Sequence, residues 1–156
     1  MIERRSIVSI LSKKAVLGSL GLVLVLSAAQ SQARDDESMR PVSDVLEKYE
    51  SKLNSDVALY FGKQSHPAVA KKLGEYPTNK KTNGFNKSDS EACEWVMLSA
   101  LLSLQERAVR EGGDAVVNIR SYYKKDEVSS ETEYECHNGA FVAGVALIGE
   151  VVKLEK

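Results

Sequence analysis

The sequence predicts an α+β protein: a small, mainly antiparallel sheet with one long helix packed on a face, plus a short N-terminal helix. Three observations favour this class. An apolar, capped helix pattern covers residues 90–111, a strand pattern follows directly at 115–123, and a second strand pattern covers 141–152. The composition, with 43% hydrophobic and 28% charged residues in a chain of 156, is that of one ordinary globular domain.

Residues 1–33 have the pattern of a secretory signal peptide. The apolar stretch 15–26 is followed by small and polar residues as far as Ala33, and it is shorter than the ~20 residues that a membrane-spanning helix needs. We therefore expect cleavage after Ala33, no membrane span after cleavage, and a periplasmic or secreted protein. No cysteine lies near the cut to carry a lipid. The basic residues that precede the apolar stretch are Arg4, Arg5, Lys13 and Lys14.

The mature chain is expected to begin with a mobile polar leader at 34–40, followed by a single α+β domain at 41–156. The signal segment contains four of the 21 basic residues and one of the 22 acidic ones, so the mature chain has a net charge near −4. Domains that bind nucleic acid present basic surfaces, and this balance argues against nucleic acid as a partner.

The first elements of the domain are a short helix and a strand. Leu46, Tyr49 and Leu53 have helical spacing after Ser43, which predicts an amphipathic helix. Apolar residues then alternate with others over 56–62, which predicts a strand that ends at a glycine.

Residues 63–87 read as a long polar loop, because prolines, glycines and asparagines interrupt them. A loop of this length is either functional or a connector of low order. The functional interpretation is an interaction loop for an envelope protein or an anionic envelope surface. The alternative is a solvated loop that happens to carry lysines. The lysines concerned are Lys71, Lys72, Lys80, Lys81 and Lys87.

The helix at 90–111 is the most fully specified element. Ser88 and Glu91 have capping-box spacing at its start, and Gly112 or Gly113 supplies the left-handed residue that ends it. The strand at 115–123 is expected to pair antiparallel with the last strand, because the connection between them is too short for a helical crossover. Tyr122, Tyr123 and Tyr134 are expected to pair across this hairpin, and a ligand platform is the alternative use of these rings.

Two cysteines, Cys93 and Cys136, predict a disulfide in an exported protein. The alternative is a soft-metal site in which Cys93, Cys136 and His137 are joined by His66, but these residues have no established ligand spacing. Three alternating glutamates, Glu131, Glu133 and Glu135, share a face if their segment is extended. They could bind a cation, and an acidic solvent face is the simpler interpretation.

Catalytic motifs are absent from the sequence: it has no phosphate loop, no dinucleotide-binding glycine pattern, no His-Glu-x-x-His and no nucleophile elbow. We therefore expect a protein that is not an enzyme, with no catalytic residues and no cofactor.

Residues 107–122, followed after a loop by 141–152, form a pattern that resembles the small α+β superfamily of YbjQ-type proteins and RcsF-type signalling domains of envelope-stress sensors. In both, a helix ends in an Ala-x-x-x-Gly-x-Asp/Asn-Ala-Val turn before a strand and a hairpin. The resemblance implies a disulfide from the helix start to the sheet, which Cys93 and Cys136 match. The second disulfide and the lipidated cysteine of the sensor have no counterpart here.

The mature sequence is also similar to small exported bacterial proteins that carry the name "excinuclease ATPase subunit". Without a phosphate loop or zinc-finger cysteines, the chain is not expected to have the activity which that name describes.

These observations predict an exported, non-enzymatic envelope accessory or stress-sensor-like interaction module. It would bind its partner through a sheet edge or the loop at 63–87. The alternative is a periplasmic protein that binds a metal or a small ligand through its Cys and His residues or its glutamate run.

Overall fold

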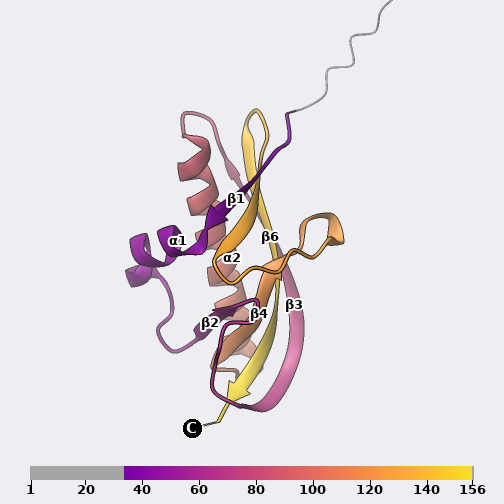
Figure 1. Ribbon diagram of the computed structural model, residues 1–156. Helices are drawn as coiled ribbons and strands as arrows, with labels where there is room; N and C mark the ends of the chain where they lie inside the picture. Colours follow the sequence, from indigo (N-terminus) through magenta and orange to yellow (C-terminus); the bar gives the residue numbers. More distant parts are fainter. Residues whose placement is uncertain (1–33, 156) are drawn as a thin grey trace, which may run out of the picture. The chain divides into compact units, whose positions relative to one another are not determined.

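A computed structural model describes residues 34–155 (Figure 1). The expected signal segment, and the cut after Ala33, lie outside these residues. The fold is α+β, as the sequence predicts, with a curled, mostly antiparallel sheet, one long helix and a short helix near the start. Its helices are α1 (Val42–Lys48), the 3-10 turns η1 (Glu50–Lys52) and η2 (Tyr123–Lys125), and α2 (Asp89–Glu111). Its strands are β1 (Asp36–Pro41), β2 (Ala58–Phe61), β3 (Val69–Asn83), β4 (Ala115–Ser121), β5 (Glu133–Asn138) and β6 (Val142–Leu154).

Strand β6 is the centre of the sheet. Along one edge it pairs antiparallel with β3 from Val142 to Leu154. Along its other edge it pairs antiparallel with β4 in its second half and with β5 at its start. The expected antiparallel pairing of the strand at 115–123 with the last strand is therefore confirmed. Strand β1 extends the sheet beyond β5, and β2 lies parallel to β4.

Helix α2 packs across one face of this sheet, and local chemistry sets both its ends. The Ser88 hydroxyl accepts from the Glu91 amide at 3.1 Å, which satisfies one of the free donors of the first turn. Gly112 ends the helix in the left-handed conformation, with φ at +77°. Gly113 lies so close to β6 that a Cβ there would be 2.7 Å from Val151 Cγ1. One glycine therefore turns the chain and the next allows the close packing.

The core lies between α2 and the sheet. The buried side chains of α2 form one stripe that faces the sheet, while Trp95 is 42% exposed and lies outside it. α1 adds Val42 and Val45 to the same core. The members of the α2 stripe are Val96, Met97, Ala100, Leu101, Leu104 and Ala108.

The mobile leader expected at 34–40 is a wrong prediction for most of that segment. From Asp36 onward it forms strand β1, in antiparallel register with β5, so that Glu37 lies opposite His137. The physical reason is that backbone amides and carbonyls pair with a free strand edge whatever their side chains. The side chains of a polar outer strand therefore do not predict that its backbone pairs with a sheet.

The prediction of a long polar loop at 63–87 is also wrong, because residues 69–83 form the 15-residue strand β3. The signals that suggest a loop are those of a protected sheet edge. Pro77 lacks an N–H, Gly74 lies at a register shift, and lysines are common on exposed edge strands. Only the short segments on either side of β3 are connections.

Candidate functional site

The predicted disulfide is present and joins Cys93, near the start of α2, to Cys136 in β5. Both residues are fully buried, and the Asn138 side-chain amide donates to Cys93 Sγ at 3.0 Å. Because the two sulfurs are bonded to each other, neither is available as a thiolate. The soft-metal alternative of Cys93 and Cys136 with His137 is therefore wrong, and the exposed His66 lies beside Tyr60 instead.

The five predicted interaction lysines do not form one surface. Lys71 and Lys72 lie at the start of β3, and Lys80 and Lys81 lie near its end, about 30 Å away at the rise of a strand. Lys72 is paired with Glu150 at 2.6 Å. The second group, with Lys87 just beyond β3, forms no ion pair among residues 34–155.

An exposed apolar cluster lies beside this second lysine group. Phe85, Phe141 and Val142 are 60%, 65% and 46% exposed, and we call them the apolar tip. The Gly84 amide donates to the Phe141 carbonyl at 2.8 Å, which places the β3–α2 loop directly against the β5–β6 turn. Figure 1 shows these two connections together at the upper end of the domain. Lys81 is opposite Gly144, two residues along β6 from the tip.

The chain enters the described domain at the same end. Arg34, the first described residue, is 2.6 Å from Asp89 at the start of α2 and also pairs with Asp36. Its carbonyl oxygen lies 3.3 Å from the position of a Cβ added to Gly139 in the β5–β6 turn. The guanidinium of Arg34 is therefore used within the domain, and its backbone lies against the β5–β6 turn.

A second candidate is a polar cluster on the outer face of β1 and β5. His137 Nε2 is 2.5 Å from Glu135 Oε1, and His137 Nδ1 is 3.0 Å from Asp35 Oδ1. The hydrogen bond from His137 lowers the pKa of Asp35. Tyr123 stacks on the imidazole with 3.4 Å between ring centroids. Glu37 belongs to the same cluster, because its carboxylate lies within 4.8 Å of the ligand atoms of Glu135 and His137.

This cluster corrects two sequence-based expectations. Tyr123 stacks on His137 while Tyr134 is buried on the opposite, core-facing side of β5, so the tyrosines do not pair across the hairpin. Of the three glutamates, Glu135 is buried against His137, and Glu131 and Glu133 are exposed. Sequence reasoning missed Asp35 and Glu37 because both were assigned to a leader. The acidic character of that segment was the only signal available.

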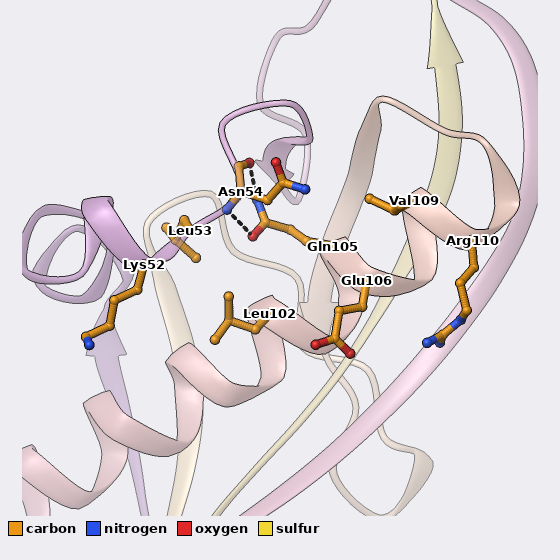
Figure 2. Close-up of a pocket in the computed structure, with 8 residues that line it drawn as sticks. All are labelled: Lys52, Leu53, Asn54, Leu102, Gln105, Glu106, Val109 and Arg110. Atoms are coloured by element: carbon orange, nitrogen blue, oxygen red, sulfur yellow. Dashed lines mark hydrogen bonds between the residues drawn. The ribbon is translucent and has the colours of Figure 1, made fainter.

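A third candidate is an open groove of about 460 Å³ between α2 and the segment after α1 (Figure 2). Figure 2 shows Gln105 of α2 bonded to the backbone of Asn54. The Gln105 side-chain nitrogen donates to the Asn54 and Val57 carbonyls, and its oxygen accepts from the Asn54 amide. Both ends of this buried side-chain amide are therefore hydrogen-bonded within the protein. Both apolar and charged side chains line the groove, and it offers a ligand no unpaired buried polar group. Its lining residues are Lys52, Leu53, Asn54, Leu102, Gln105, Glu106, Val109 and Arg110.

The fold and these features define a small α+β domain with one disulfide, an apolar tip and a polar cluster on the outer sheet face. Among residues 34–155, no helix is both long and apolar enough to cross a membrane. The chain matches no protein-family model, no curated protein and no solved structure. The resemblance to YbjQ-type proteins and RcsF-type domains stays a prediction.

Proposed function

We propose that this protein is an exported, non-enzymatic module of the cell envelope that docks on an anionic lipid surface through the apolar tip. The observation that supports this most directly is the pair of exposed rings, Phe85 and Phe141, on two adjoining turns. Export is supported by the N-terminal sequence pattern and by the disulfide, which is typical of oxidising compartments. The absence of catalytic motifs from the sequence supports a binding role.

Exposed aromatic side chains on adjoining turns suit the boundary between lipid headgroups and acyl chains. Removing one Phe side chain from water contributes about 1.5–3 kcal/mol, and Phe85 and Phe141 already lie in the exposed positions from which they could insert. Each lysine near an anionic surface contributes about 1 kcal/mol more. Lys81, opposite Gly144, and Lys87, two residues beyond Phe85, can act in this way because they form no ion pair among residues 34–155; the Lys87 ammonium donates to the Asn83 carbonyl at 3.0 Å.

The position of the chain entry favours a lipid surface over other occupants of the tip. Arg34 lies against the β5–β6 turn, and the apolar stretch 15–26 precedes it by only a few residues. In the uncleaved chain, Arg34 links that stretch covalently to the end of the domain that carries the tip. The edge of β3 is less suited to partner binding, because Pro77 interrupts its line of amide donors.

Vesicle sedimentation tests this proposal. We expect the purified chain to bind phosphatidylglycerol vesicles and not phosphatidylcholine vesicles at physiological salt. Replacing both rings, Phe85→Ser with Phe141→Ser, is expected to weaken binding more than about tenfold. Val109→Ser is the matched control, because Val109 is 55% exposed on α2 and lies outside the tip.

A second pair of variants tests the charges. Reversing both tip lysines, Lys81→Glu with Lys87→Glu, is expected to weaken binding to anionic vesicles about tenfold or more, whereas Lys71→Glu at the far end of β3 is expected to leave it unchanged. Equal binding to both vesicle types, or no binding to either, would contradict the proposal. A photo-crosslinker at position 141 that captures one envelope protein in cells, without vesicle binding, would assign the tip to a protein partner instead.

A further inference from the structure

The polar cluster on β1 and β5 has the composition and spacing of a cation site. One carboxylate oxygen each from Glu37 and Glu135 and one ring nitrogen of His137 all lie within 4.8 Å of one another. The three residues come from two paired strands, with Glu37 directly opposite His137 and Glu135 two positions earlier on the same face of β5. A rigid ladder of backbone hydrogen bonds therefore sets their spacing.

The imidazole is held in one orientation by its neighbours. Asp35 Oδ1 lies 3.0 Å from His137 Nδ1 and can accept a hydrogen bond from it. The other ring nitrogen, Nε2, then faces Glu135. Tyr123 stacks on the ring at an angle of 15°, so the ring plane is fixed as well. A carboxylate on the far nitrogen of a histidine is the usual outer partner of a ligating imidazole.

The charges around Glu135 and His137 also favour a cation. The two residues are 7% and 8% exposed, although they lie on the face of β5 opposite the core. Glu37 adds a carboxylate that forms no ion pair among residues 34–155. Two carboxylates and one imidazole so close together leave net negative charge, which a divalent cation would neutralise.

We propose that Glu37, Glu135 and His137 bind a zinc-type divalent cation, with Asp35 as the outer partner of His137. Imidazole with carboxylate ligands suits Zn²⁺, which takes nitrogen and oxygen ligands at four positions, whereas Ca²⁺ and Mg²⁺ prefer oxygen alone. The proton shared between His137 Nε2 and Glu135 leaves to solvent when Nε2 coordinates the ion, and a water molecule completes the four ligands.

Binding at this site would tie the N-terminal strand to the sheet. Glu37 is on β1, which pairs with β5 alone, and Glu135 and His137 are on β5. An ion between them cross-links the two strands through side chains, independently of the apolar tip. The variants of Phe85 and Phe141 are accordingly expected to bind zinc like the unaltered chain.

Calorimetric titration of the metal-free, disulfide-intact chain with ZnCl₂ tests the proposal. We expect one zinc per chain, no comparable binding of Ca²⁺, and a shift of the His137 Nε2 signal in nitrogen-15 spectra. Glu37→Gln and His137→Gln are each expected to weaken binding more than about tenfold, and Asp35→Asn about 10- to 100-fold. The matched control is Glu133→Gln, an exposed carboxylate on β5 outside the ligand set, which is expected to leave the affinity unchanged.

Several outcomes would overturn the proposal. These are no saturable zinc binding, an affinity unaffected by Glu37→Gln, calcium binding as tight as zinc binding, or equal weakening by Glu133→Gln. If His137→Gln fails to fold, Glu37→Gln decides the question, because Glu37 is exposed on an outer strand and its replacement leaves the core intact.

Discussion

The two faces of strand β5 are both buried, but opposite kinds of interaction cover them. Toward α2, Tyr134 and Cys136 enter the core, and Cys136 is bonded to the helix through Cys93. On the other face, Glu135 and His137 are shielded by each other and by the residues around them. Alternation along six residues thus separates a covalent, apolar contact from a charged one.

The two faces therefore differ in what they contribute: the core face stabilises the fold, and the outer face can bind an exchangeable ion. Apolar and covalent contacts need no specific charge state, and they hold the helix on the sheet at any moderate pH. A buried acid and base remain favourable only while both partners are present. The outer face of β5 is therefore the place where a cation can exchange, and the core face is not.

The largest expected effect comes from the core face. Replacing Cys93 and Cys136 together by Ala is expected to lower the free energy of unfolding by about 4 kcal/mol, because the 43-residue separation they span is no longer constrained in the unfolded chain. Urea unfolding of the variant and of the oxidised chain measures the difference. A loss below about 1 kcal/mol would show that packing alone holds α2 to β5.

The outer face is tested by removing one member of its charged pair. Without metal, His137→Gln is expected to lower the free energy of unfolding by about 3 kcal/mol, since Glu135 loses the buried side chain to which it is hydrogen-bonded. Adding Glu135→Gln to that variant is expected to recover most of the loss. If the double variant is as unstable as His137→Gln alone, the two side chains are not coupled and the outer face is held by shape rather than charge.

A smaller change of opposite sign is expected at Tyr134. Its hydroxyl is buried and has no hydrogen-bond partner among residues 34–155, and burial raises its pKa far above the ordinary value. Tyr134→Phe removes this unpaired group and is expected to raise the free energy of unfolding by up to about 1 kcal/mol. Thermal unfolding monitored by circular dichroism is sensitive enough to detect it. Destabilisation instead would mean that the hydroxyl has a partner, such as a bound water.

The smallest expected effect concerns pH and an ion pair on the outer face of the sheet. Hydrogen bonds from Lys72 and Asn118 lower the pKa of Glu150 below its ordinary value of 4.5. A carboxyl with a lowered folded-state pKa stabilises the fold above its unfolded pKa, and that contribution disappears as the pH falls through the folded value.

Glu150→Gln should therefore reduce stability at pH 7 by about 0.5 kcal/mol, a value discounted because Lys72 is 71% exposed. It should also flatten the fall in stability below pH 4.5. Unfolding midpoints measured between pH 3 and pH 7 test both effects. An unchanged acid profile in the variant would exclude this pair as a contributor.

Some elements could be predicted because their signals are local. Ser88 and Gly112 specify the ends of α2 through the chemistry of a single turn. Cys93 and Cys136 have only each other to pair with among the cysteines of this sequence. The candidate sites were less accessible, because the lysines were expected in one loop and the structure separates them along one strand.

The sequence by itself determined the fold class, the limits of α2, the disulfide and the pairing of the last strands. The tertiary structure alone decided that Asp36–Pro41 and Val69–Asn83 are strands, and that Asp35 and His137 meet across 102 residues of chain. The reason is physical. Helix caps and glycine turns depend on neighbouring residues, whereas the hydrogen bonds of a strand belong to a distant partner, and polar side chains on an outer strand do not record them.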